Sequence, residues 1–180
     1  MWRSAYGVQV TQTFIEFDYK GAMAYGHRYN EKIANVLNQL GISCHAPELT
    51  FAETTEDRDN YTLYEKDIVL DKINGCIEVK SMNRIFSTDP ETFPLANIIV
   101  DTVSGYNKKV EKPLAYIIVS QHTQDAIVVP VSTYDLWFQD QKMDFQRGIY
   151  ENFYFCPKGL AKPFSELVDY LRHLQESSAA

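Results

Sequence analysis

The sequence lacks a long apolar segment: none of its 180 residues lies in a run of eighteen consecutive apolar side chains. A helix that spans a membrane needs about 20 such residues, so a membrane-spanning protein is not expected. The first residues, MWRSAYGVQVTQTF, also lack the basic and then apolar pattern of a secretory signal. We therefore expect a soluble protein of the cytoplasm with no membrane partner.

Cysteine is scarce as well. The three cysteines are widely spaced and never form a CxxC pair, and the four histidines do not stand at a metal-binding spacing such as HxxxH. This pattern predicts neither a disulfide framework nor a zinc ribbon. Cys44, Cys76 and Cys156 are therefore expected to be buried thiols in a reducing compartment, and no zinc site is expected.

Positive charge is in deficit: 17 Lys and Arg residues stand against 24 Asp and Glu residues, which gives a formal net charge of −7. Indiscriminate binding of nucleic acid depends on neutralising many phosphates with basic side chains, so the composition argues against it. A nuclease is not excluded, because carboxylates that hold a divalent cation can accept phosphate beside a local basic face. The partner must therefore be inferred from the site.

The chain does contain enough apolar residues, 45% of the total, to bury one substantial core. There are no internal repeats and no low-complexity linker, so we predict a single domain over residues 1–180. Hydrophobic periodicity predicts a strand at 15–19, a helix at 22–40 that ends at Gly41, a weak strand near Leu49, a hairpin with arms 67–70 and 76–80, a helix at 93–106, strands at 113–120 and 125–132, and a helix at 163–176. The aromatic stretch 134–155 indicates core packing or an oligomer interface. This order predicts an α/β fold with a mixed β-sheet flanked by helices.

The hairpin, KDIVLDKINGCIEVKS, carries the candidate chemistry. Side chains alternate across a strand, so for either plausible turn length one face holds Ile68, Leu70, Ile77 and Val79, and the other holds Asp67, Val69, Asp71, Glu78 and Lys80. Charges gathered on a half-buried face are costly unless they pair or bind a cation. Magnesium prefers carboxylate and water oxygens and keeps positions open for a substrate phosphate, so we predict a Mg²⁺ site there, with a lysine beside it.

These residues resemble a known signature. Asp67 followed by Glu78-Val79-Lys80 is similar to the D…(D/E)xK motif of the PD-(D/E)XK phosphodiesterase superfamily, which contains restriction endonucleases, Holliday junction resolvases, repair nucleases and some homing endonucleases. The helix from Gly26 to Glu31 has the GxxxxE form found in many members. The resemblance implies a restriction-endonuclease-like αβββαβ core at about 22–132, with an N-terminal strand extension at 1–21 and a C-terminal aromatic segment and helix at 133–180.

The resemblance also implies roles for the matching residues. Glu31, Asp67, Glu78 and Lys80 would be catalytic. Asp67 and Glu78 would hold Mg²⁺, with the backbone carbonyl of Val79 as a further ligand and Glu31 completing the shell directly or through water, and Mn²⁺ would substitute. Lys66 stands where many members have proline, and parity alone leaves Asp71 as an alternative to Asp67. We prefer Asp67, because Asp71 is explained as a residue entering the turn.

Basic and amide side chains near the motif are candidates for contact with nucleic acid. They are Arg28, Lys32, Arg84, Lys108, Lys109 and Gln121. For Lys108 and Lys109, which with Lys112 form the densest basic cluster, binding of phosphate and simple solvation of a helix end are equally consistent with the sequence. A charged helix face is the default explanation for Arg28, Lys32 and Arg84, and a satisfied strand-end pair is the default for Gln121.

The sequence therefore predicts a magnesium-dependent endonuclease that hydrolyses the phosphodiester bonds of double-stranded DNA. A site-selective enzyme of the restriction or homing type is preferred, and a structure-selective or repair nuclease such as a junction resolvase is the alternative. A catalytically inactive module that binds nucleic acid or protein is the third possibility, and the intact Asp, Glu and Lys argue against it. Because cutting both strands calls for two sites, we expect a homodimer.

Overall fold

The computed structural model describes residues 19–54, 57, 63–144 and 148–178. The described helices are α1 (Tyr19–Gln39), α3 (Val103–Lys108) and α4 (Phe164–Ser178), with the short 3-10 helices η1 (Pro90–Thr92), η2 (Val131–Leu136) and η3 (Lys158–Leu160). The strands are β1 (Cys44–His45), β2 (Ile68–Leu70), β3 (Cys76–Met82), β4 (Asn97–Thr102), β5 (Ala115–Ser120), β6 (Ala126–Pro130), β7 (Phe138–Asp144), β8 (Ile149–Pro157) and β9 (Lys162–Pro163). The strand predicted at 15–19 lies outside the described residues except for Tyr19, which begins α1.

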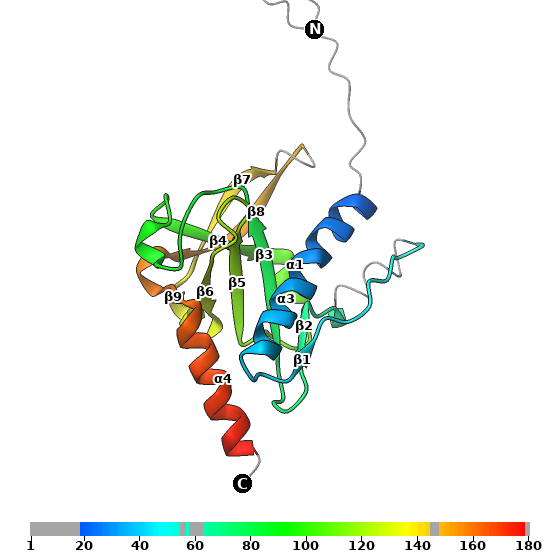
Figure 1. Cartoon of the computed structure of the whole chain (residues 1–180). Helices are drawn as coiled ribbons and strands as arrows, with labels where there is room; N and C mark the ends of the chain where they lie inside the picture. The colour runs from blue at the N-terminus through cyan, green and yellow to red at the C-terminus, as the bar shows by residue number, and fades with distance from the viewer. Residues whose placement is uncertain (1–18, 55–56, 58–62, 145–147, 179–180) are drawn as a thin grey trace, which may run out of the picture.

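A six-stranded sheet forms the centre of the fold, in the order β1-β2-β3-β5-β6-β9 (Figure 1). The neighbours β3 and β5 are parallel, and the other neighbouring strands are antiparallel. The helix predicted at 22–40, the hairpin, the two strands after it and the last helix are confirmed. The chain is therefore a mixed α/β protein whose mixed sheet is flanked by helices.

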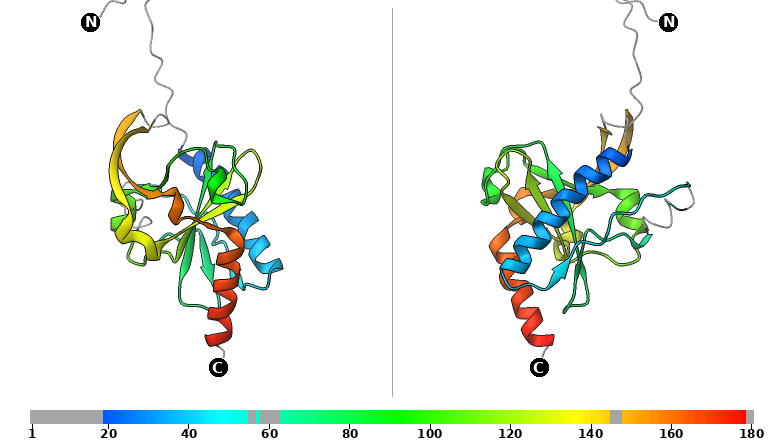
Figure 2. Two further views of the ribbon diagram at one scale, coloured as in Figure 1. Left: turned by 90° about the vertical axis from the view of Figure 1, so that its left-hand side faces the viewer. Right: turned by 45° about the vertical axis from the view of Figure 1, so that its right-hand side comes forward.

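The two faces of this sheet are covered differently. On one face, α1 and α4 contribute Leu37 and Leu171 to a core that also contains Ile77, Ile117 and other apolar residues of the sheet. On the other face, Tyr116 and Ile118 belong to a second core with residues of β4 and β8. These two strands and β7 form a three-stranded sheet in the order β4-β8-β7 (Figure 2). The second sheet lies opposite α1 and α4.

Two predicted elements are wrong. The segment predicted as a helix at 93–106 forms strand β4 and only then the short helix α3, because Ile98 and Val100 alternate into the second core. The β-branched run fits both periodicities, and pairing with β8 decides in favour of the strand. The weak strand near Leu49 is absent, since the strand that pairs with β2 is β1 instead. The aromatic stretch supplies β7, β8 and part of the second core, as the core interpretation predicted.

In the part of the chain that the structure describes, no helix has both the length and the apolar character that crossing a membrane requires.

Candidate functional site

Asp67 and Glu78 stand level with each other on the β2–β3 hairpin. The two strands are antiparallel with Ile68 opposite Ile77, so Asp67, immediately before β2, comes level with Glu78. Ile68 and Ile77 are fully buried in the core beneath α1 and α4. Glu78 points to the opposite face of β3, where its register partner on β5 is Tyr116. The two faces predicted from alternation are confirmed.

Two neighbours fix the Asp67 carboxylate. The side chain of Asn30, from the middle of α1, donates a 2.8 Å hydrogen bond to Asp67 Oδ1. The backbone N–H of Val79 donates to Oδ2, also at 2.8 Å. Because Asn30 is buried and Val79 lies inside a strand, neither donor moves freely. Asp67 is therefore held in one orientation between the first helix and the central sheet.

Glu78 is buried and forms an ion pair with Lys109. Its Oε1 lies 3.0 Å from Lys109 Nζ, and the two side chains are only 6% and 11% exposed. Burial raises the pKa of Glu78 strongly, and the neighbouring Asp67 carboxylate raises it further. Lys109 and Lys80 offset part of this effect. The charged form of Glu78 is therefore disfavoured, mainly by burial, by more than Lys109 and Lys80 offset.

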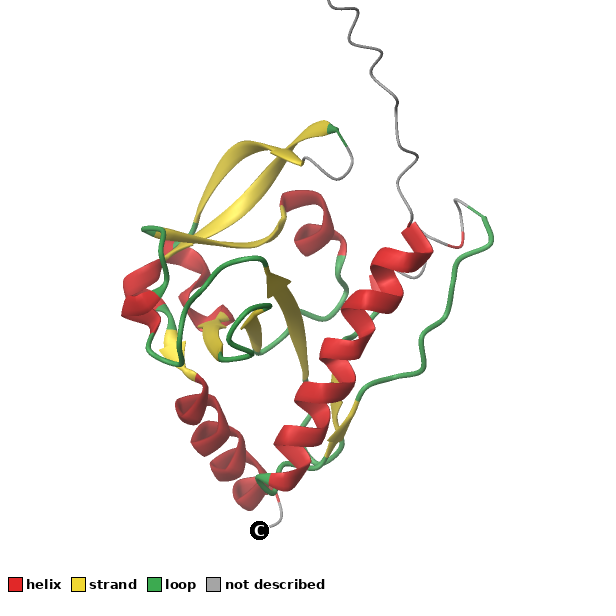
Figure 3. Cartoon of the chain, turned by 45° about the horizontal axis from the view of Figure 1, so that its top comes forward, coloured by secondary structure: helices red, strands yellow, loops and turns green. Residues whose placement is uncertain are grey.

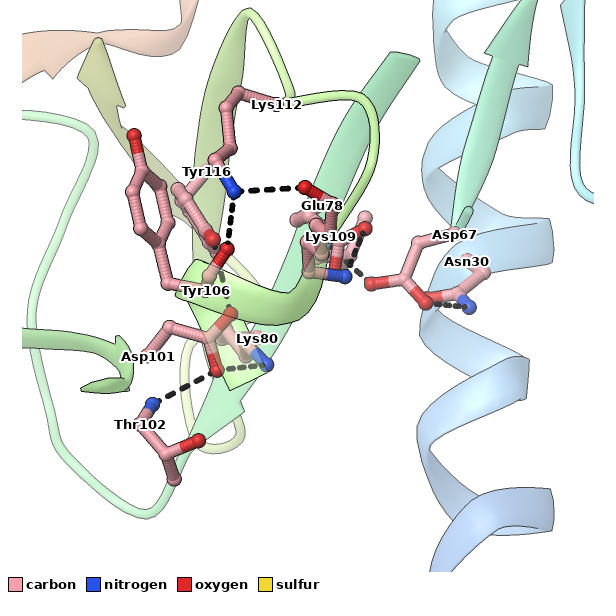
Figure 4. A network of polar contacts seen from close by, with 11 residues as sticks. Asn30, Asp67, Glu78, Lys80, Asp101, Thr102, Tyr106, Lys109, Lys112 and Tyr116 are labelled. Atoms are coloured by element: carbon pink, nitrogen blue, oxygen red, sulfur yellow. Dashed lines mark hydrogen bonds and ion pairs between the residues drawn. The ribbon is translucent and has the colours of Figure 1, made fainter. Parts of the chain in front are cut away.

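Lys80 is directed toward Asp101, the residue near the end of β4. Its Nζ lies 3.4 Å from Asp101 Oδ1, which also accepts the backbone N–H of Thr102 at 2.9 Å. The hydroxyl of Tyr116 donates to the other Asp101 oxygen at 2.9 Å. Burial alone would lower the pKa of Lys80, but the carboxylates of Asp101, Glu78 and Asp67 outweigh it and raise this pKa. Lys80 is therefore a cation held at Asp101, on the same polar side of the hairpin as Glu78 and Asp67 (Figure 4).

Helix α3 brings Lys109 to the site. Thr102 is its N-cap, and the Thr102 side chain accepts the N–H of Gly105. A Cβ at Gly105 would lie 2.7 Å from Thr102 Oγ1 and 3.4 Å from Asp101 Oδ1, so this close approach requires glycine. The single helical segment ends at Lys108, and Lys109 follows as its C-cap. Asp101 and Lys109 thus come from the two ends of one short element.

These side chains line a cavity of about 740 Å³. Asp67, Glu78, Lys80, Asp101 and Lys109 contribute to its wall, together with residues of α1 and of the segments 47–50 and 64–66. A further carboxylate, Glu65, also lines the cavity and is exposed to solvent. Partial burial and the nearby Asp67 raise the pKa of Glu65. The cavity is large enough to admit part of a polymer rather than an ion alone.

The structure brings four of the predicted residues together with one predicted basic contact. Asp67, Glu78, Val79, Lys80 and Lys109 all line the cavity. The N–H of Val79, rather than its carbonyl, contacts Asp67. Glu31 is not brought to the cavity, because its side chain is 61% exposed and lies 3.6 Å from His27 on its own helix.

The remaining predicted residues lie elsewhere. Asp71 accepts hydrogen bonds from Ser43 and His45 at the turn of the hairpin, outside the cavity. The exposed Arg28 and Lys32 belong to α1, and Lys32 donates to Gln124 at 2.7 Å. Arg84, Lys108 and Gln121 do not line the cavity either, and Gln121 donates to Ser81.

Asn30, Asp101 and Tyr116 are site residues that sequence reasoning missed. Asn30 directly precedes Glu31 within the GxxxxE motif, so the motif drew attention to the helix but to the wrong side chain. Asp101 lies in the segment predicted as a helix, where it had no reason to face Lys80. Tyr116 lies in an apolar run that predicted a buried strand. The available signal was the polar group within each apolar run: the Asp101 carboxylate after residues 98–100, and the Tyr116 hydroxyl in the run PLAYIIVS.

Two carboxylates of the cavity wall, Asp67 and Glu78, could hold a small divalent cation. No group of three His, Cys, Asp or Glu side chains surrounds a possible metal position within the described ranges. Mg²⁺, however, commonly uses one or two protein carboxylates and keeps several waters. Asp67 and Glu78 provide such oxygens. The pKa of Glu78 is raised by burial first and by the Asp67 charge second, and a cation beside the two carboxylates would favour the charged form of Glu78. Mn²⁺ has the same oxygen preference.

Comparison with known protein families, with curated proteins and with solved structures finds no match to this chain. Function must therefore be inferred from the geometry of the site.

Proposed function

We propose that the chain is a metal-dependent DNA endonuclease of the PD-(D/E)XK superfamily. The observation that carries this proposal is the convergence of Asp67, Glu78 and Lys80 on one cavity. Their spacing is that of the family motif, and their side chains meet on the polar face of the hairpin. Two carboxylates at a buried site are costly unless nearby cations offset their charge, and this cost is consistent with a site that binds a cation.

The order of elements supports the same assignment. Helix α1 is followed by the antiparallel strands β1, β2 and β3, then by helix α3 and by β5, which lies parallel to β3. This sequence of elements corresponds to the expected αβββαβ core. The departure is β4, which precedes α3 and joins the second sheet. The inserted strand β4 carries Asp101, which contacts Lys80.

Asp67 and Glu78 would hold Mg²⁺ or Mn²⁺. Such an ion, when bound, supplies a Lewis acid that polarises phosphate and stabilises the leaving oxygen. The protein's own residues prepare the position: Asn30 and the N–H of Val79 orient Asp67. Glu78 contacts Lys109 in this structure, and an ion held by Glu78 would leave the Lys109 ammonium available to the cavity.

Lys80 and Lys109 would serve the substrate. Asp101 and Tyr116 hold the Lys80 ammonium where it can orient a water molecule for in-line attack on phosphorus. The positive charge of Lys80 also offsets negative charge that develops on the phosphate oxygens. Lys109 lines the same cavity and would contact a phosphate of the backbone. Double-stranded DNA is the proposed substrate, and a homodimer would supply one such site for each strand.

Cleavage of supercoiled plasmid and of a pooled duplex library, with Mg²⁺, Mn²⁺ or EDTA, tests this function. We expect metal-dependent cleavage by the wild-type protein and its loss in Lys80→Ala. The matched control is Lys72→Ala, because Lys72 is an exposed lysine in the turn of the same hairpin. This variant should cleave as well as the wild type.

The products distinguish the classes of nuclease. Discrete fragments identify a site-selective enzyme, whereas nicking at many sequences, also lost in Lys80→Ala, identifies a structure-selective or repair enzyme. Equal inactivity of wild type and variant on every substrate would sink the nuclease proposal.

A further inference from the structure

Strand β7 has a neighbouring strand on one side only, within the described part of the chain. It pairs with β8 along its whole length and is the last strand in the order β4-β8-β7. Figure 3 shows this hairpin projecting from the rest of the fold. The first five residues of β7 are exposed, and the last two are only partly buried. An exposed edge of this length is a template for another strand.

One backbone N–H of β7 is hydrogen-bonded to a side chain instead of to a neighbouring strand. The backbone N–H of Gln141, the central residue of β7, donates to the side chain of Asp140 at 2.9 Å. In an antiparallel ladder, N–H groups point alternately to the two sides of a strand. The Asp144 carbonyl accepts the Gly148 N–H across the turn to β8, so by alternation the Gln141 N–H, three residues earlier, faces the outer edge, where the Asp140 side chain accepts it. A second strand could take over this position with a backbone carbonyl.

The charges along β7 match those of an inverted copy of the same strand. Asp140 and Lys142 flank Gln141 on one face and form an ion pair of 2.9 Å within the strand. If two β7 strands pair antiparallel about Gln141, Asp140 of each comes opposite Lys142 of the other. Opposite charges at facing positions stabilise a strand pair and like charges destabilise it. The charge pattern of β7 therefore suits antiparallel pairing with a second copy of itself.

We propose that two copies of this chain associate through β7, antiparallel about Gln141, and so join their three-stranded sheets into one continuous sheet. Each Gln141 then donates its backbone N–H to the Gln141 carbonyl of the other copy. Exposed apolar side chains flank the seam: Phe138 begins β7, and Ile149 and Tyr150 begin β8. Their presence beside an unpaired edge supports burial against a partner. This proposal does not depend on nuclease activity.

Charge exchange on the strand tests the pairing. The molar mass of the full chain is measured by light scattering after size exclusion, at the highest soluble concentration. We expect a dimer for the wild type and half that mass for Asp140→Lys and for Lys142→Asp, because each places like charges opposite one another at two positions. The double variant Asp140→Lys with Lys142→Asp restores opposite pairs and should restore the dimer.

Cysteine cross-linking tests the register independently. Gln141→Cys should form an intermolecular disulfide on mild oxidation, because this residue faces its own copy at the two-fold axis. Gln139→Cys is the matched control: its copy would lie four positions away along the strand, or about 13 Å, and should not cross-link. The native cysteines are free and buried. A monomeric wild type, single charge variants that remain dimers, or equal cross-linking at both positions would each overturn the proposal.

Discussion

At the scale of single residues, Asp101 sets the position of the Lys80 ammonium. It accepts from Lys80, Tyr116 and the N–H of Thr102, while its own side chain is only 9% exposed. We predict that Asp101→Asn lowers kcat on the order of 100-fold, because a misplaced group costs about that much, and leaves KM for DNA nearly unchanged. Steady-state cleavage kinetics measure both values.

Tyr116→Phe is the companion variant for this prediction. It removes one hydrogen bond to Asp101 without changing a charge, so kcat should fall by a smaller factor. A rise in KM at constant kcat in either variant would contradict the positioning role of Asp101. Binding of Mn²⁺, measured by calorimetry, should persist in both variants, which separates this role from metal binding.

We predict that the charged form of Glu78 lowers the free energy of unfolding. Its pKa is raised in the folded protein, so its protonated form is favoured by folding. The stability it contributes is present below the unfolded pKa and is lost as pH rises through the folded pKa. Glu78→Gln should therefore raise the Tm at pH 8 without metal, by about 2–4 °C for each kcal/mol, and the gain should vanish toward pH 4.

Differential scanning calorimetry across this pH range measures the effect. Glu176→Gln, at an exposed position near the end of α4, is the matched control and should change Tm at neither pH. A lower Tm for Glu78→Gln at pH 8 would mean that Lys109 and Lys80 compensate the Glu78 carboxylate fully.

The site residues that could be predicted from the sequence were those whose side chains alternate along one hairpin. Asp67, Glu78 and Lys80 lie within one hairpin, and strand parity alone places them on one face. Asp101 and Asn30 reach the same place only through long-range packing of β4 and α1, which local periodicity does not contain. Glu31 was chosen over Asn30 because the motif names a carboxylate, although the neighbouring amide is the group that faces Asp67.

At the scale of elements, the first turn of α3 depends on the absence of a side chain at Gly105. An added Cβ would collide with the Thr102 hydroxyl that caps the helix. We predict that Gly105→Ala lowers the free energy of unfolding by about 0.5–2 kcal/mol, the cost of a lost N-cap. Urea unfolding followed by circular dichroism measures this change.

Gly26 offers a helical control for the same substitution. Nothing lies within 4 Å of a Cβ at this position in α1. Gly26→Ala should therefore stabilise the protein by about 1 kcal/mol, the usual advantage of Ala over Gly inside a helix. Equal effects of the two substitutions would show that the contact with Thr102 does not limit α3.

A helix or strand was predictable where its apolar residues fitted only one periodicity, helical or alternating. It was not predictable where the same residues fitted both. The apolar stripe of α1 and the alternation of the hairpin each allowed one reading. The segment 93–106 satisfied helical spacing and strand alternation together, and only the pairing of β4 with β8, more than fifty residues later in the chain, distinguishes them. Sheet partners of this kind are set by tertiary packing rather than by local propensity.

At the scale of the whole molecule, divalent metal should stabilise the fold. Relief of the repulsion between Asp67 and Glu78 is available only to the folded state, where the two carboxylates meet. With Mg²⁺ at 100 times its Kd, linkage predicts about 2.7 kcal/mol of added stability, or a rise in Tm of about 5–10 °C. Thermal unfolding with MgCl₂ or with NaCl of equal ionic strength tests this expectation.

Asp67→Asn should abolish the stabilisation by metal while the protein remains folded, because Asn retains an oxygen for one of the two donors that contact Asp67. An equal rise in Tm for this variant would place the metal elsewhere on the protein.

The segment between β3 and β5, which contains β4 and α3, leaves the central sheet and returns to it, and this excursion has a consequence for synthesis of the chain. Glu78 and Lys80 emerge from the ribosome before Asp101 and Lys109, which lie in that excursion, and β8, on which β4 depends, emerges later still. Non-local strand pairs form slowly, because the intervening chain must be ordered first. A nascent or truncated chain should therefore carry Asp67 and Glu78 before Asp101 is in place to hold Lys80. The wall of the cavity is completed only when the second sheet closes over the first.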